Sequence, residues 1–478
     1  MGRCRSCFFC SFFFMFLTGF PALQEVLIFG YTFFTMKKIK KFSLILLVEI
    51  LSVLFFSVSC AKKNSNETED AAMARKQAHL MALKSKAIDE FMEHLSLEEK
   101  ICQLFIVNLV GERKFLPVEL YSAFCIEPSL ASKAMIPGGF LFFSYNVSDD
   151  PVTVMEFTDS IKRDCVEGKQ ILPFLAIDQE GGYVNRLRKL CGPLPSPKRV
   201  AQNLSIQKAY ELYALQAKQM KLLGFNMNIA PVIEVETADN SVFLDGRSFG
   251  DEKAVLSYGD KCISAYEDNG IAAVAKHFPG NTNIDPHSGL PEISLSQAQM
   301  EEAVAPFRDL VRLRLCGVLM SHARTSVLDS NIPSCLSKSW VTGRLRDEFG
   351  FDGIIFSDDI FMGALNDNGF PPEKACVDAI EAGVTCIMIS EKRFAKPASV
   401  LLKKAKEDAF FCQKINLAAR KMIEYKAMEG ILSFDFSEDG ENCALSQRFM
   451  PTSLSERKQL FQKLADENRL LYKENFIN

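Results

Sequence analysis

The chain alternates short runs of apolar residues with longer stretches in which apolar residues recur at helical spacing. Short apolar runs of this kind recur between about residue 85 and residue 430. They cover residues 101–110, 138–143, 172–177, 227–235, 271–275, 316–320, 353–356 and 384–389. Nearly continuous apolar runs are typical of parallel strands, because helices cover both faces of a parallel sheet. The pattern therefore predicts eight buried strands.

Amphipathic stretches separate most of these runs and predict the helices that cross over between parallel strands. Examples are residues 206–223, 254–268, 295–313 and 338–348. Eight strands with helical crossovers match a (β/α)8 barrel better than an open doubly wound sheet. No Gly-x-Gly-x-x-Gly motif opens a helix after the first strand, which counts against a dinucleotide-binding fold.

We therefore predict an α/β fold in which residues 85–430 form one catalytic domain, a (β/α)8 TIM-type barrel. Residues 431–478 hold a polar linker and one charged helix. We expect this C-terminal helical tail to be too short to form a second core.

The beginning of the chain has the features of an export signal. Basic residues follow Met36, an apolar stretch covers residues 42–58, and a serine precedes Cys60. A basic start, a short apolar core and a small residue before the cut describe a secretory signal. With a cysteine at the cut, the segment resembles a bacterial lipoprotein signal. An uncleaved membrane anchor is the alternative.

This resemblance implies that residues 36–60 are the signal peptide and that Cys60 becomes the lipidated first residue. Residues 1–35 are then upstream sequence included by a mis-called start. The polar residues 61–84 suit a tether between lipid and domain. We expect an exported protein, anchored by lipid to a bacterial membrane on its periplasmic or cell-surface face.

Composition narrows the range of partners. Hydrophobic residues make up 48% and charged residues 24%, which allows a full core and argues against disorder. A net charge of −4 without a basic tract in the folded part argues against nucleic acid as a partner.

Most of the 15 cysteines are scattered without metal-ligand spacing. Cys4, Cys7 and Cys10 precede the expected mature protein, so we predict no metal site and no cofactor.

Polar and charged residues gather where the predicted strands end. The chain has five histidines, and two of them fall within the twelve residues 276–287. The clusters are Asp178, Glu180 and Arg186 after the third run, Arg247 after the fourth, Lys276, His277, Asp285 and His287 after the fifth, His322 after the sixth, and Asp358 and Asp359 after the seventh. Barrel enzymes build their active sites at the carboxyl ends of the strands. Clusters at several equivalent ends therefore predict one shared pocket.

Several of these segments together resemble glycoside hydrolase family 3. The matching segments are DQEGG with NRL (178–187), GRSFG (246–250), KHFPG (276–280), DPH (285–287) and FDGIIFSDDIFM (351–362). They are most similar to the single-domain bacterial β-N-acetylglucosaminidases that act on cell-wall fragments. The resemblance covers about residues 90–430 and implies an eight-stranded barrel, retention of configuration and no metal.

The resemblance also implies roles for individual residues. Asp358 matches the nucleophile, His287 the acid/base and Asp285 its partner. The residues that match those holding the sugar's hydroxyl and N-acetyl groups are Asp178, Arg186, Arg247, Lys276 and His277. A retaining glycosidase needs a carboxylate on one side of the anomeric carbon and a proton donor near the leaving oxygen. An imidazole titrates near neutrality and can serve as that donor, with Glu180 as the next candidate.

The chain departs from the family pattern at a few positions. The loop from Pro279 to His287 is two residues shorter than usual, and Pro286 replaces a serine, which fixes one backbone dihedral. The resemblance implies a mobile loop here, so a shorter and stiffer one puts its closing motion in question. Tyr183 stands where arginine is common, and Glu234 where aspartate is common, which affects sugar preference more than reaction type.

These observations predict a retaining exo-β-N-acetylglucosaminidase that acts as a monomer on glycans containing N-acetylglucosamine. A family 3 β-glucosidase or a glycoside phosphorylase is the alternative among enzymes. The typical two-domain β-glucosidases take their acid from a second domain, and a histidine donor does not repel phosphate as a carboxylate would. A lipid-anchored sugar-binding protein is the alternative outside enzymes, and the intact Asp358, Asp285 and His287 argue against it.

Overall fold

The structure is a computed structural model that describes residues 71–109, 111 and 135–477. It divides into two compact units, Met1–Met81 and Ala82–Asn478. In the first unit, the described residues 71–81 are helical. The predicted upstream sequence, the signal with Cys60 and the first part of the tether lie outside the described residues. Among the helices that the structure describes, none combines the length and apolar character needed to cross a membrane.

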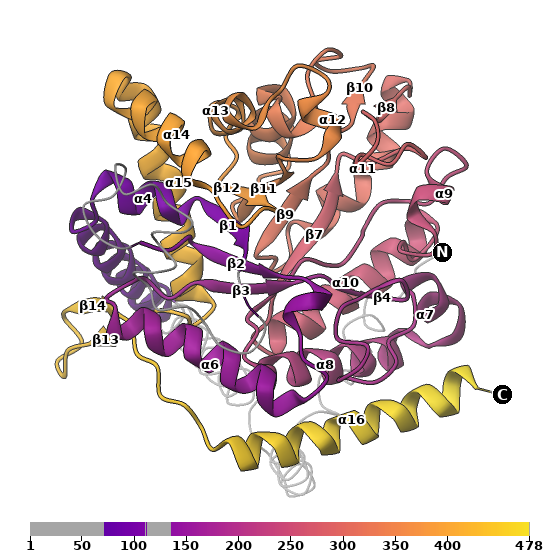
Figure 1. Ribbon diagram of the computed structural model, residues 1–478, viewed down its shortest axis with the longest axis horizontal. Helices are drawn as coiled ribbons and strands as arrows, with labels where there is room; N and C mark the ends of the chain where they lie inside the picture. The colour runs from indigo at the N-terminus through magenta and orange to yellow at the C-terminus, as the bar shows by residue number, and fades with distance from the viewer. Residues whose placement is uncertain (1–70, 110, 112–134, 478) are drawn as a thin grey trace, which may run out of the picture. The chain divides into compact units, whose positions relative to one another are not determined.

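The second unit contains a closed barrel of eight parallel strands, which confirms the predicted (β/α)8 fold (Figure 1). The strands are β1 (Phe105–Asn108), β2 (Gly139–Phe142), β3 (Phe174–Ile177), β6 (Met227–Asn228), β7 (Ala272–Phe278), β9 (Gly317–Met320), β11 (Ile354–Asp359) and β12 (Cys386–Ile389). They follow one another around the barrel in chain order, and β12 pairs with β1 to close it. All eight carboxyl ends therefore open at the same end of the barrel.

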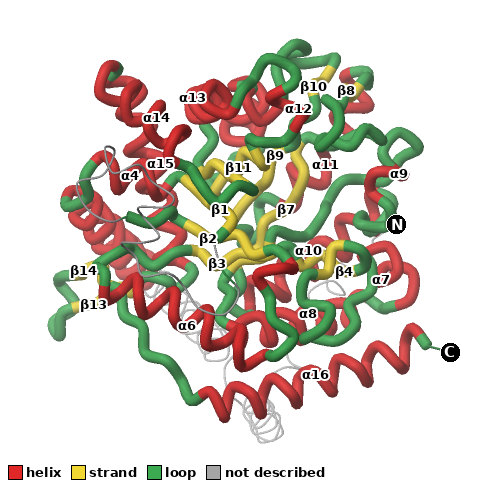
Figure 2. Tube along the Cα trace, viewed as in Figure 1, coloured by secondary structure: helices red, strands yellow, loops and turns green. Residues whose placement is uncertain are grey.

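Helices surround the strands, as Figure 2 shows by colour. They are α4 (Leu97–Gln103), α6 (Pro151–Glu167), α7 (Pro197–Asn203), α8 (Ile206–Leu223), α9 (Ser241–Leu244), α10 (Glu252–Asp268), α11 (Gln297–Leu310), α12 (Gly363–Asn366), α13 (Pro372–Ala382), α14 (Ala395–Glu407) and α15 (Ala409–Met428). The predicted helices at residues 206–223, 254–268 and 295–313 correspond to α8, α10 and α11. The stretch at residues 338–348 is also helical, but it is wound as a π-helix, η4 (Ser339–Glu348).

Two predicted strands are shorter, by more than two residues, than the apolar runs that indicated them. The run at residues 101–110 begins inside α4, which starts at a capping box formed by Ser96 and Glu99. The run at residues 227–235 gives only the two residues of β6. Pro231 lies in that run and lacks an N–H, so the ladder cannot continue past it unbroken.

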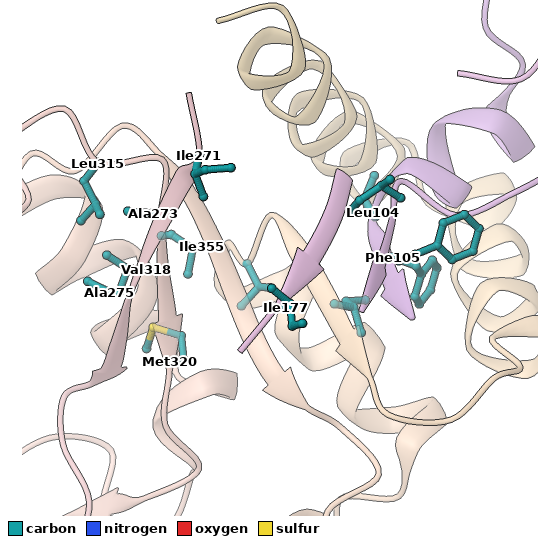
Figure 3. Packing of buried hydrophobic residues seen from close by; sticks show 14 of the residues in the cluster. Leu104, Phe105, Ile177, Ile271, Ala273, Ala275, Leu315, Val318, Met320 and Ile355 are labelled. Atoms are coloured by element: carbon teal, nitrogen blue, oxygen red, sulfur yellow. The ribbon is translucent and has the colours of Figure 1, made fainter. Parts of the chain in front are cut away.

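The apolar core occupies two layers. Side chains such as Ile106, Val274 and Phe356 fill the barrel interior. Their neighbours along the same strands point outward to the helices and form a larger cluster. Figure 3 shows Ala273 and Ala275 of β7 beside Val318 of β9 in this outer layer. Burial on both faces explains why the strands appear in the sequence as continuous apolar runs.

The C-terminal tail packs against the outside of the barrel. A hairpin of β13 (Ser433–Phe436) and β14 (Cys443–Ser446) leads to α16 (Leu454–Phe476), which lies along α8 and α6 (Figure 1). Arg457 forms a buried ion pair with Asp159 of α6 at 2.6 Å. Asn468 donates hydrogen bonds to the carbonyls of Cys191 and Pro193 at 2.9 and 3.0 Å, so the tail is fixed to the barrel.

Candidate active site

The carboxyl ends of β3, β6, β7 and β11 bring the predicted site residues together. The innermost group is a network of buried charges around Glu180, whose side chain is 1% exposed. Arg247 donates from Nε and Nη2 to the two carboxylate oxygens of Glu180 at 2.8 and 2.9 Å. Lys276 Nζ lies 2.6 Å from Glu180 Oε1 and 2.7 Å from Asp178 Oδ1. The network therefore joins the loops that follow β3 and β6 to strand β7.

The electrostatics of Glu180 decide what it can do. Burial alone would raise the pKa of its carboxyl group. The charges and hydrogen bonds of Arg247 and Lys276 outweigh burial and hold that pKa well below its ordinary value. Glu180 is therefore an ionised anchor for two cations. In this state Glu180 is poorly suited to replace His287 as a proton donor, because a donor needs a pKa near neutrality.

A second network centres on Glu234 and His277. His277 Nδ1 lies 2.6 Å from Glu234 Oε1, and the His277 backbone N–H donates to the same oxygen at 3.3 Å. Because Nδ1 faces a carboxylate, it is the nitrogen that carries the proton, and Nε2 is left for a ligand. The ring of Phe243 lies 6.3 Å from the His277 ring and 5.4 Å from the guanidinium carbon of Arg247. Phe243 thus packs against two predicted sugar-binding side chains.

Arg186 occupies a different part of the site. It follows the hairpin of β4 (Gln179–Gly181) and β5 (Val184–Asn185), and its guanidinium carbon lies 5.9 Å from the ring centre of Phe143. Its Nε is buried and has no hydrogen-bond partner among the described residues. A buried donor without a partner is costly, and a hydrogen bond to a ligand or water that reached this atom would remove that cost.

The predicted acid/base pair is formed in the loop after β7. His287 Nδ1 lies 2.8 Å from Asp285 Oδ1, and the His287 backbone N–H donates to the same oxygen at 2.9 Å. This backbone bond, followed by the His287 side chain and the charge of Arg247, lowers the pKa of Asp285 against the opposing effect of desolvation. The His287 side chain is 75% exposed. It is therefore accessible to a leaving group and to water.

Asp358 lies at the end of β11, where the register with β12 shifts between Phe356 and Asp359. Its backbone has φ = 64°, a left-handed conformation that is uncommon outside glycine. The Asp358 carboxylate accepts one backbone hydrogen bond, from Asp359 at 2.7 Å. The carboxylate of Asp359 accepts two, from Phe361 and Ser390 at 3.1 and 3.0 Å. Both side chains are half-buried, and Asp359 ties the strand end to the segments at Phe361 and Ser390.

His322 belongs to the scaffold of the site. The sequence placed it in the reaction centre, but the residue is 1% exposed. Its Nε2 lies 3.0 Å from the carbonyl oxygen of Asp359 and its Nδ1 lies 3.2 Å from Cys335 Sγ. With both ring nitrogens engaged, His322 supports the backbone next to Asp358.

Phe243 was missed by sequence reasoning, because an aromatic residue in a polar loop carries no sign of its packing partners.

Within the described ranges, no three side chains of His, Cys, Asp or Glu gather as metal ligands would.

The chain is similar to known proteins in sequence and in fold. The sequence model of the "Glycosyl hydrolase family 3 N terminal domain" matches residues 96–424. A β-hexosaminidase of Alkalilimnicola ehrlichii is 31% identical over 270 residues, which are 55% of this chain and 76% of that protein. β-Hexosaminidase A of Pseudoalteromonas piscicida is 28% identical over 273 residues, which are 52% of this chain and 44% of that protein.

A solved structure of LpqI from M. tuberculosis has a similar fold. It superimposes with a TM-score of 0.60 at 26% identity, over 70% of this chain and 94% of that chain. The chain therefore spans less than half the length of one curated relative and most of the length of a solved one.

Proposed function

Because the chain belongs to glycosyl hydrolase family 3, we propose that it is a retaining exo-β-N-acetylglucosaminidase. The observation that carries the proposal is the Asp285–His287 pair, with 2.8 Å between ring and carboxylate, in a loop that contacts the segment after Asp358. The names of the curated relatives support a hexosaminide as substrate.

The proposed mechanism has two steps. Asp358 attacks the anomeric carbon and forms a glycosyl-aspartate while His287 protonates the leaving oxygen. His287 then takes a proton from water, which attacks the same carbon and releases the sugar. Asp285 orients the imidazole and stabilises its cationic form.

The charged network supplies the binding energy in this proposal. Lys276, Arg247 and Arg186 offer fixed donors to the hydroxyl and N-acetyl groups of the sugar, and His277 offers Nε2. Because Glu180 and Glu234 already hold three of these side chains in place, little reorganisation is needed when substrate binds.

An assay with 4-nitrophenyl N-acetyl-β-glucosaminide and 4-nitrophenyl β-glucoside, each with and without phosphate, tests the proposal. We expect hydrolysis of the N-acetylated substrate to dominate and to be independent of phosphate. Preference for the glucoside would identify a β-glucosidase, and sugar phosphate as product would identify a phosphorylase. Binding of N-acetylglucosamine without turnover of either substrate would identify a sugar-binding protein.

We also propose that the enzyme acts as a monomer on cell-wall fragments and is anchored by lipid at Cys60. The sequence of residues 36–60 supports this location. Cys60→Ser should abolish incorporation of labelled fatty acid and release the protein from membranes. If the variant stays in the membrane, the apolar segment at residues 42–58 is itself the anchor.

A further inference from the structure

The segment that carries the proposed acid/base pair, residues 279–290, is held at several points along its length; we refer to it as the dyad loop. At its beginning, Asn281 Nδ2 donates to Glu234 Oε1 at 3.2 Å. The same oxygen lies 2.6 Å from Nδ1 of the His277 ring. The start of the dyad loop is therefore bonded to the carboxylate that orients a predicted sugar-binding residue.

The middle of the dyad loop is held by a single side chain, Asn283. Its Oδ1 accepts from the backbone N–H groups of Val242 and Phe243 at 2.8 and 3.3 Å. Its Nδ2 donates to the carbonyl of Ala238 at 2.9 Å. One amide thus makes three hydrogen bonds to the loop after β6, and Phe243 in that loop packs against Arg247 and His277.

The far side of the dyad loop contacts the segment that follows the proposed nucleophile. The carbonyl of Pro286 accepts from the backbone N–H of Ala364 in α12 at 3.0 Å. A Cβ on Gly363 would lie 2.8 Å from the His287 carbonyl oxygen, so only glycine allows this approach. Shortly after the dyad loop comes β8 (Glu292–Ile293), which pairs with β10 (Arg324–Thr325).

These contacts hold the dyad loop between the loops that follow β6 and β11. All three contacts of Asn283 are made by its side-chain amide, so one substitution can remove them. We propose that Asn283 is a positioning residue that holds the Asp285–His287 pair at the sugar site. The proposal rests on the proposed function, because it assigns Asn283 to the placement of that acid/base. It departs from the mobile loop that the family resemblance implies, and the two-residue shortening and Pro286 act in the same direction.

Loss of this contact has a specific chemical signature. A proton donor must lie within hydrogen-bond reach of the leaving oxygen, and a displacement of about 1 Å can cost on the order of 100-fold in rate. A leaving group that departs as a stable anion needs little protonation. Misplacing His287 therefore slows poor leaving groups selectively, whereas general damage to the site slows all substrates equally.

The experiment compares Asn283→Ala with wild type on an alkyl and on a dinitrophenyl N-acetyl-β-glucosaminide, with His287→Ala as the reference. We expect Asn283→Ala to reduce kcat/KM about 10-fold on the alkyl glycoside and less than about 3-fold on the aryl glycoside. His287→Ala should show the same pattern in stronger form. Asn283→Asp should recover only part of the loss, because its carboxylate can still accept from Val242 and Phe243 but cannot donate to the carbonyl of Ala238.

Asn416→Ala is the matched control, since Asn416 on α15 donates to the Cys412 carbonyl at 2.9 Å, away from the site. Amide hydrogen exchange gives a readout that does not depend on turnover. Exchange in the dyad loop should rise in Asn283→Ala and stay at the wild-type level in Asn416→Ala. Equal losses on both substrates, or unchanged exchange in the dyad loop, would overturn the role of Asn283. Absence of hydrolysis by wild type with increased loop exchange in the variant would instead contradict the proposed function alone.

Discussion

The two ends of the barrel each bury a glutamate, and they treat its charge in opposite ways. Glu180 at the site end and Glu267 at the end of α10 have side chains that are 1% and 2% exposed. Glu180 has Arg247 and Lys276 within 2.9 Å. Glu267 accepts the backbone N–H groups of Ala273 and Cys316 at 2.8 and 3.1 Å, at the amino ends of β7 and β9.

The cation nearest to Glu267 is distant by comparison. Arg314 lies 3.9 Å from Glu267 Oε2 and 3.9 Å from Glu429 Oε1, and its side chain is 59% exposed. Burial, followed by the charge of Glu429, raises the pKa of Glu267 to about 8. At Glu180 the two close cations overcome a similar burial and keep the group ionised. Burial therefore does not by itself decide the charge of a carboxyl group, and the contacts of its oxygens do.

The comparison has a functional consequence. The carboxylates at the site end hold the cations that we propose bind the sugar, so in this proposal their ionisation is part of the binding surface. The carboxyl pair at the opposite end contacts backbone N–H groups at the amino ends of β7 and β9 and has a raised pKa. We expect variants at the two ends to differ accordingly.

The largest effect is expected for Glu180→Gln. The change removes the negative charge that is paired with Lys276 and Arg247. Removing one partner of a buried ion pair typically costs about 3–5 kcal/mol. We expect a fall of that size in the free energy of unfolding, measured by urea titration, and at least a 100-fold loss of kcat/KM at permissive temperature. Glu301→Gln on α11, which removes an ion pair with Arg344 of η4, is the control. Near-normal binding and stability would mean that the cations need no buried anion.

A change of opposite sign is expected for Glu267→Gln. The raised pKa of Glu267 stabilises the fold fully below its ordinary value of 4.5, and this contribution is lost as pH rises through about 8. Glutamine keeps an acceptor for Ala273 and Cys316 but cannot ionise. The variant should therefore be more stable than wild type at pH 8, by roughly 1–3 kcal/mol, and the difference should shrink toward pH 4.5.

Urea titrations of both proteins across this pH range measure the difference. Glu438→Gln, an exposed glutamate in the β13–β14 turn, should follow wild type throughout. Parallel pH profiles for wild type and Glu267→Gln would show that Glu267 is already ionised in the folded protein.

The smallest effect is expected for Arg314→Ala. The guanidinium is largely exposed and its contacts are long, so the loss should be below about 1 kcal/mol. It should be larger at pH 8 than at pH 5, because the positive charge matters only when the carboxyl pair is ionised. Thermal unfolding at the two pH values measures it, and a loss that is greater at pH 5 would contradict the assignment of the proton to this pair.

The barrel was predictable from sequence because each strand is covered on both faces and so appears as an apolar run. The errors arose where local chemistry interrupts a run. A capping box at Ser96 starts a helix that takes the first residues of one run, and Pro231 ends the ladder in another. Apolar character alone does not register either feature.

The candidate site was predictable as a set of residues but not as a set of contacts. Asp178, Lys276 and Asp358 follow apolar runs, so their place at the carboxyl ends could be inferred. Glu180 and Arg247 are 67 residues apart, and only the closed barrel brings them to hydrogen-bond distance. The scaffold position of His322 depends on similar distant contacts. Spacing along the chain carries no information on such pairs.

Covalent labelling of the nucleophile tests the proposed active site most directly. A fluorinated N-acetylglucosaminyl donor with an activated leaving group should accumulate as a glycosyl-enzyme, because the fluorine slows both steps and the leaving group restores the rate of the first. After proteolysis, mass spectrometry should place one sugar on Asp358 in the wild type and none in Asp358→Ala. A label on Asp359, or steady turnover without any labelled peptide, would contradict the proposed glycosyl-aspartate and the site built around it.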